Sequence, residues 1–206
     1  MMMNNRRATL AALAALAALS STGCAPLLVG GAAAGSAMVA VDRRSTGIQL
    51  VDQEIELRLM KALGDAFPSD RAHINVTSYN QRVLLTGEVT SEQGKAEAQA
   101  IAEKSKDVRA VVNELHIGSP STLSNRNFDT SLTTKVRTAL LQAPDVPSGA
   151  IKVVSERAVV YLMGLVTPGE GEAAARVASR VSGVQRVVKN FDYLSEKEAA
   201  KDAPAK

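Results

Sequence analysis

Residues 74–90 read INVTSYNQRVLLTGEVT, and residues 151–167 read IKVVSERAVVYLMGLVT. The two stretches align at an offset of 77 residues, which places Gly87 on Gly164. A block further along the chain repeats at an offset of 76, so one residue has been lost between the two blocks. A period this long, with helix and strand patterns inside it, indicates two copies of one small domain rather than a solenoid.

The first copy predicts the order α-β-β-α-β. A helix with Asp52 as its N-cap precedes two strands of alternating apolar residues, which are joined by a turn at 79–82. Ser91 caps a second helix, and residues 108–117 form the third strand. Gly87 lies within a predicted strand, where glycine indicates that another element packs close, and we expect this element to be the crossing helix.

The second copy repeats this order. Asp129 or Thr130 is the predicted N-cap of its first helix, and Pro168 opens its second helix. Gly164 takes the place of Gly87. The predicted fold class is therefore α+β: two tandem α-β-β-α-β domains, each a small three-stranded sheet packed against two helices.

The start of the chain has the features of a secretion signal. Arg6 and Arg7 precede an uncharged Ala/Leu stretch at 8–19, which is too short for a comfortable membrane span. Small residues follow, and then Cys24, the single cysteine of the chain. This arrangement resembles a bacterial lipobox and implies a covalent lipid on Cys24. Ala25 follows where an Asp is common in lipoproteins kept at the inner membrane, which implies the outer membrane. The alternative is a soluble secreted protein with an unmodified cysteine.

The sequence predicts six segments along the chain. They are a lipoprotein signal peptide (1–23), the acylated Cys24 with a Gly/Ala-rich tether (24–47), a first domain (48–118), a linker (119–125), a second domain (126–195) and a disordered tail (196–206).

The two copies differ in the sign of their charge. Residues 48–118 carry 8 basic and 11 acidic side chains, a net charge of −3, whereas residues 126–195 carry 9 basic and 6 acidic, a net charge of +3. Opposite charges on related domains indicate different binding surfaces.

Enzyme and metal sites are not predicted. His73 and His116 have no cysteine nearby, and a zinc site needs three or four converging ligands. No G-x-S-x-G motif is present. We expect His73 to be a surface residue, and we expect no cofactor besides the lipid on Cys24. We also expect no nucleic-acid partner, because export to the periplasm separates the protein from nucleic acid.

The motifs of both copies resemble the BON domain. In the second copy VYLMGLV (160–166) precedes an Ala-rich helix, which SGVQRVV (182–188) follows; the first copy has Asp107 in place of the second motif's Gly183. Together with the lipobox and the link DRRSTGIQL, the chain resembles dual-BON outer-membrane lipoproteins. The resemblance implies a non-enzymatic protein that faces the periplasm and binds anionic phospholipid, such as phosphatidylglycerol, through its second domain. It also implies a role in outer-membrane integrity and at division sites.

The helix FDTSLTTKVRTAL (128–140) is the predicted lipid-binding element. Phe128 is placed towards the core, Ser131 shares the outer face with Lys135, and Arg137 flanks that face. The family pattern implies Trp at the position of Ser131. Either Phe128 or Leu141 substitutes for it, or the contact is more electrostatic and weaker here. The candidate lipid-binding residues are Lys135, Arg137, Ser131, Phe128, Thr134 and Thr138. The alternative function is an envelope protein-interaction adaptor with no lipid recognition of its own, in which the two oppositely charged domains bind each other or an envelope partner.

Overall fold

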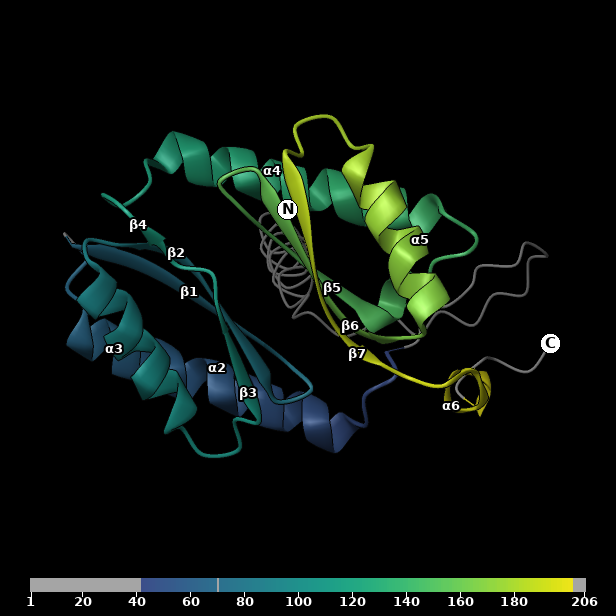
Figure 1. Cartoon of the computed structure of the whole chain (residues 1–206), viewed down its shortest axis with the longest axis horizontal. Coiled ribbons are helices and arrows are strands. Elements are labelled where there is room, and N and C mark those ends of the chain that lie inside the picture. Colours follow the sequence, from purple (N-terminus) through teal and green to yellow (C-terminus); the bar gives the residue numbers. More distant parts are fainter. Residues whose placement is uncertain (1–41, 70, 202–206) are drawn as a thin grey trace, which may run out of the picture. The chain divides into compact units, whose positions relative to one another are not determined.

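Two copies of one α-β-β-α-β unit follow each other in the structure (Figure 1). The computed structural model describes residues 42–69 and 71–201. The first repeat contains α2 (Thr46–Ala66), β1 (Ala72–Tyr79), β2 (Arg82–Val89), α3 (Glu92–Glu103), β3 (Ala110–Asn113) and β4 (His116–Ile117). The second repeat contains α4 (Leu123–Gln142), the 3-10 turn η1 (Ser148–Ala150), β5 (Ile151–Glu156), β6 (Val159–Val166), α5 (Pro168–Ser179) and β7 (Arg186–Tyr193). The predicted α+β fold is confirmed.

The second strand of each repeat is the centre of its sheet. β2 lies between antiparallel β1 and parallel β3, and β6 lies between antiparallel β5 and parallel β7. The predicted third strand of the first repeat is split, because β4 pairs with β2 only after a break at which the Asn113 side chain accepts a hydrogen bond from the Leu115 N–H. Helices α2 and α3 cover one face of the first sheet, and α4 and α5 cover one face of the second (Figure 1).

Each repeat has its own apolar core between helices and sheet. In the first, every second residue on much of β2 points to the helices, as strand geometry requires. The buried residues of this core are Ile55, Leu59, Leu63, Ala72, Val83, Leu85, Val89, Ala98, Ala102 and Leu115. In the second, Leu132, Val136 and Leu140 of α4 pack against the sheet. The intervening strand residues point away from the helices.

The first helix of each repeat begins earlier than the sequence predicted. Ser45 is the N-cap of α2 and Thr122 that of α4, and each hydroxyl accepts a hydrogen bond from the backbone N–H three residues on. The predicted N-caps were wrong. Asp52 and Asp129 lie inside these helices and are buried.

Asp52 and Asp129 bind the hairpin turns instead. The two central residues of each turn have positive φ, the type I′ geometry that suits a two-residue hairpin. Asp52 accepts hydrogen bonds from the N–H groups of Asn80 and Gln81, and Asp129 accepts them from the N–H groups that follow Glu156. Each carboxylate therefore fixes its helix to its hairpin.

The strand glycines face a neighbouring strand. A Cβ at Gly87, which has φ of +109°, would lie 1.9 Å from the backbone oxygen of His73 on β1. A Cβ at Gly164 would lie 2.5 Å from the backbone oxygen of Ala150. The expectation that the crossing helix requires these glycines was therefore wrong, because the close contact is with the backbone of strand β1 for Gly87 and with the turn η1 that leads into β5 for Gly164.

Two predicted segments contain more structure than expected. Helix α4 begins at Leu123, inside the predicted linker 119–125. Residues Glu196–Lys201, predicted as part of a disordered tail, form α6, in which Ala199 is buried. The prediction of disorder was wrong there, because α6 is helical and buries an apolar residue. The remaining tail, the predicted signal peptide and Cys24 lie outside the described residues.

Candidate functional site

The outer face of α4 carries most of the predicted lipid-binding residues. Ser131, Thr134, Lys135 and Thr138 are all exposed. Asp129 is the single acidic residue of the helix, and it is buried and bound to the hairpin turn. The solvent-facing surface of α4 therefore carries cationic and hydroxyl groups without a carboxylate.

Phe128 and Arg137 lie on the flanks of this face. The Phe128 side chain is 47% exposed, so its predicted place in the core was wrong. Its ring lies beside Gly183, where an added Cβ would approach the ring at 3.2 Å. Arg137 is exposed and turns towards β5, where its Nη2 donates a long hydrogen bond to the Val153 oxygen at 3.5 Å. The two predicted cations, Lys135 and Arg137, therefore point to different sides of the helix.

The threonine hydroxyls of this face are already used as donors. Thr134 Oγ1 donates to the Thr130 oxygen at 3.1 Å, and Thr138 Oγ1 donates to the Thr134 oxygen at 3.0 Å. The Ser131 hydroxyl has no partner among the described residues. Ser131 can therefore donate to a phosphate oxygen without giving up a bond within the helix, whereas Thr134 and Thr138 cannot.

The helix-free faces of the two sheets pack against each other. Both repeats fall within one compact unit of the chain. Tyr79 and Leu84 of the first repeat are buried against Tyr161 and Met163 of the second. The Tyr79 hydroxyl donates a hydrogen bond to the Ala150 oxygen at 2.9 Å. An apolar contact between the repeats therefore covers the sheet faces that the helices leave open.

Ion pairs between the two repeats surround this apolar contact. Some of the charged side chains that give the repeats their opposite net charges are therefore paired with each other. Glu56 pairs with Lys152 at 2.7 Å, and Glu114 contacts Arg186 at 3.8 Å. In the opposite sense, Asp192 on β7 pairs with Arg82 at 2.7 Å and also with Arg109. Among the described residues of the second repeat, the cationic groups that form no ion pair therefore lie on α4 and at the end of α5: Arg126, Lys135, Arg137, Arg176 and Arg180.

The link before α2 contacts both repeats. The Arg44 guanidinium lies over the Tyr79 ring, 3.9 Å from its centroid, and pairs with Asp52 at 2.8 Å. Arg43 forms a two-pronged ion pair with Glu170 of α5, at 2.7 and 2.8 Å. The two neighbouring arginines therefore fasten the start of the described chain to each repeat.

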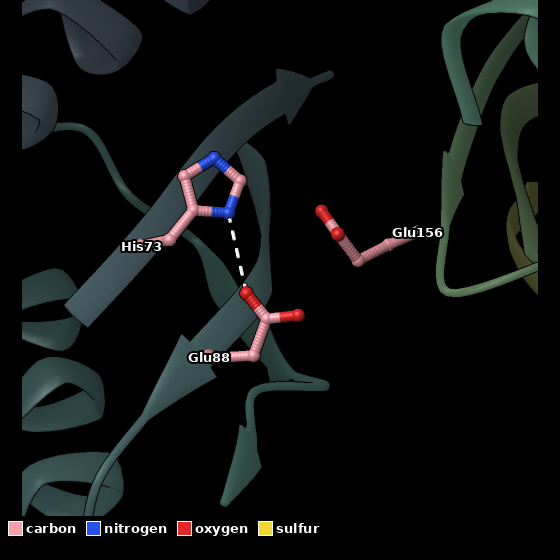
Figure 2. Close-up of side chains that lie close together, drawn as sticks. All are labelled: His73, Glu88 and Glu156. Carbon is pink, nitrogen blue, oxygen red and sulfur yellow. Dashed lines mark hydrogen bonds and ion pairs between the residues drawn. The ribbon is translucent and has the colours of Figure 1, made fainter. Parts of the chain in front are cut away.

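A polar cluster lies at one edge of the interface between the repeats (Figure 2). His73 on β1 stands opposite Glu88 on β2, and Glu156 reaches both from the end of β5. Polar atoms of the three side chains lie within 4.8 Å of one another. His73 Nδ1 lies 3.3 Å from Glu88 Oε2, and the Asn75 amide donates to Glu156 at 2.8 Å. These three residues are the group in the described part of the chain that could hold a metal ion.

Sequence reasoning missed this cluster. His73 was expected at the surface, but its side chain is only 19% exposed. Glu88 is fully buried and Glu156 is 5% exposed. The alternation of strand residues would have placed His73 and Glu88 on the helix-free face. Glu156 could not have been added, because it comes from the other repeat.

The pKa of the Glu156 carboxyl is raised from 4.5 to about 7, chiefly by burial and also by the neighbouring carboxylates of Glu88 and Asp129, while the Asn75 hydrogen bond and Arg126 oppose the shift. The folded chain therefore binds more protons than the unfolded chain between these two pH values. It follows that the free energy of unfolding falls as the pH rises through this window.

We expect Glu156→Gln to remove this loss of stability. The full effect is on the order of 3 kcal/mol for a shift of this size, and the amide still accepts the Asn75 hydrogen bond. The check is urea unfolding of both proteins, with a chelator present, across pH 4.5 to 7. The variant should be the more stable protein at the upper end and show a flatter profile. Parallel profiles would show that Glu156 does not carry the pH dependence.

A comparison with protein-family models matches the BON domain twice, over residues 51–119 and 128–195. The chain belongs to the BON-domain family. The two matches span α2 to β4 and α4 to β7, so each structural repeat is one BON domain. The resemblance found from the motifs is therefore confirmed.

Curated relatives cover most of this dual-BON chain. It is 38% identical over 173 residues to "Outer membrane lipoprotein DolP" of Haemophilus influenzae, which is 84% of this chain and 89% of that protein. It is 34% identical to "21 kDa hemolysin" of Actinobacillus pleuropneumoniae, over 75% of this chain and 80% of that protein. "Osmotically-inducible protein Y" of Escherichia coli is 30% identical, over 66% and 69% of the two chains. Among solved structures, CdsD of the Chlamydia trachomatis type III secretion system matches with a TM-score of 0.31 at 10% identity, covering 70% of this chain and 95% of that one.

Within the described residues of this BON-family chain, no helix combines the length and apolar composition needed to span a bilayer.

Proposed function

We propose that this chain is a non-enzymatic outer-membrane lipoprotein that faces the periplasm, is anchored by acyl chains on Cys24 and binds anionic phospholipid through α4 of its second BON domain. The similarity to an outer-membrane lipoprotein over most of both chains supports the location. The lipobox-like stretch before Cys24 supports the anchor. In this role the protein supports outer-membrane integrity, with division sites as one place of action.

The observation that carries the lipid proposal is the charge of the α4 surface. Lys135 and Arg137 have no acidic partner among the described residues, and the helix shows no carboxylate to solvent. The corresponding helix of the first domain, α2, differs: there Lys61 pairs with Asp65 at 2.6 Å, and Arg58 lies 4.0 Å from Glu54. An anionic surface is therefore attracted to α4, whereas α2 satisfies its own charges.

The energy of this contact comes from several weak terms. A Lys or Arg near an anionic membrane contributes about 1 kcal/mol. Leu123 and Leu141, which are 75% and 64% exposed, add apolar surface at the two ends of α4, and Phe128 adds an aromatic ring. A contact of this strength suffices for a tethered protein, because the acyl anchor converts lipid binding into an intramolecular event at high effective concentration.

Co-sedimentation with vesicles tests this function. The protein is residues 25–206, which lack the acyl anchor, and the vesicles contain either phosphatidylglycerol or only neutral lipid. We expect binding to the anionic vesicles alone, weakened by salt. The double variant Lys135→Gln/Arg137→Gln should bind about 30-fold more weakly, because it loses about 2 kcal/mol.

The matched control removes two cations from the other helix of the same domain. Arg176 on α5 and Arg180, the C-cap of α5, are exposed and have no ion pair among the described residues. Arg176→Gln/Arg180→Gln should bind nearly as well as the parent. Equal losses of binding in the two double variants would show that general positive charge, and not a site on α4, binds the lipid. No binding by the parent would show that the protein does not recognise lipid without its acyl anchor.

An adaptor function is the second candidate, and one observation favours it. Leu50, Leu57 and Met60 form an exposed apolar strip along α2, at 56%, 66% and 50% exposure. Such a strip suits a protein partner in the envelope. Lipid-independent capture of an envelope protein by the parent, lost in Leu57→Ser, would favour the adaptor.

A further inference from the structure

The polar cluster between the two BON domains has the donors of a transition-metal site. An imidazole nitrogen comes from His73 and carboxylate oxygens come from Glu88 and Glu156, and these atoms lie within 4.8 Å of one another (Figure 2). The three residues lie on β1, β2 and β5, so strands of both domains contribute. Donors from three rigid strands are held in place without the ion.

The burial of this cluster calls for a compensating positive charge. Glu88 is 0% exposed and Glu156 is 5% exposed. Two neighbouring buried carboxylates are costly unless they are paired or bind a cation. The nearest guanidinium, that of Arg157, lies 3.5 Å from Glu88 and its side chain is 46% exposed, so it offsets only part of the charge.

One buried hydroxyl group on the ligand-bearing face of β2 has no partner. Thr86 is 1% exposed, and its Oγ1 finds no hydrogen-bond partner in the described part of the chain. Thr86 stands two residues before Glu88, on the same face of β2. An unsatisfied polar atom on the face that carries a ligand points to a polar occupant, such as an ion with its bound water.

A path for an ion leads to the cluster. A cavity of about 340 Å³ is lined by His73, Asn75, Ser155 and Glu156, among other residues. A metal site needs such an entry path as well as suitable ligands.

We propose that His73, Glu88 and Glu156 bind one divalent transition-metal ion of the zinc type between the two BON domains, with water in the remaining position. The imidazole favours zinc over calcium or magnesium, which prefer all-oxygen sites. Zinc–ligand distances of about 2.1 Å bring ligand atoms to roughly 3.4 Å from one another, so atoms that now lie within 4.8 Å must approach by up to about 1.4 Å. The ion would join the two sheets and stabilise the contact between the domains.

Zinc titration of the full chain carrying Cys24→Ser, in mild detergent, tests the site. The substitution removes the one thiol that could itself bind zinc. We expect one saturable equivalent by calorimetry, and a higher thermal unfolding midpoint with zinc than with chelator. Glu156→Gln and His73→Gln should each weaken zinc binding at least about tenfold and abolish the thermal shift.

His116→Gln is the matched control, because His116 is an exposed histidine that stands opposite Glu88 on the neighbouring strand β4 without belonging to the group of three possible ligands. It should bind zinc as the parent does. Folding of each variant is checked by circular dichroism and by the unfolding midpoint in chelator, and Glu156→Gln is expected to be at least as stable as the parent there. The absence of saturable binding by the parent, parent-like affinity in either cluster variant, or an equal loss in His116→Gln would overturn the proposal.

Discussion

Replacement of Gly87 by alanine is expected to lower the free energy of unfolding by about 3 kcal/mol or more. Gly87 has φ of +109°, a backbone conformation that side chains disfavour, and its Cβ would lie 1.9 Å from the His73 oxygen. Since Gly87 pairs with Ile74 inside the β1–β2 ladder, with paired residues on both sides, the strands can separate there only by breaking this register. Urea unfolding followed by circular dichroism measures the loss.

Gly64→Ala is the matched control for Gly87. Gly64 lies in α2, is exposed, and a Cβ there would meet nothing within 4 Å. Alanine at this helical position should raise stability by about 0.5–1 kcal/mol. A loss of under about 1 kcal/mol in Gly87→Ala would contradict the strand geometry from which this expectation comes.

Asp52→Ala is expected to lower the free energy of unfolding by about 3–5 kcal/mol. The carboxylate accepts hydrogen bonds from the backbone N–H groups of Asn80 and Gln81, both at 2.7 Å, and from the Ser78 hydroxyl at 2.6 Å. It also pairs with Arg44. Truncation leaves all these donors without their acceptor in a buried place, and it releases the hairpin from α2.

The control for Asp52 is its neighbour on the same helix. Glu54 is 69% exposed and contacts only Arg58, at 4.0 Å, in the described part of the chain. Glu54→Ala should change stability by less than about 0.5 kcal/mol. Unfolding curves of the two variants, measured together, separate the loss of a buried acceptor from the loss of one negative charge. Similar curves would show that Asp52 does not hold the hairpin.

Local patterns predicted the elements of this fold, because helix periodicity, strand alternation and capping residues act within short stretches. Ser91 and Pro168 open their helices as expected. Asp52 was misread, because an aspartate before an apolar helix pattern is typical of an N-cap. Only the folded hairpin, about thirty residues further on, shows that this carboxylate serves a turn.

The residues of the candidate sites also fall into those that the sequence could place and those that it could not. Residues of one helix, such as Ser131 and Lys135, could be placed on a common outer face from their spacing, and both are exposed. Phe128 could not, because its exposure depends on where Gly183 lies in the folded domain. The cluster of His73, Glu88 and Glu156 needs both sheets in contact, which spacing along one repeat does not reveal.

The most direct test of the central claim is a residue-by-residue map of lipid contact. Amide NMR spectra of residues 25–206 are recorded with phosphatidylglycerol nanodiscs and with neutral nanodiscs. Binding through α4 predicts shift changes at Ser131, Lys135 and their neighbours with the anionic lipid only. Changes centred on Leu57 and Met60 of α2, or none that distinguish the two lipids, would contradict lipid recognition by the second BON domain.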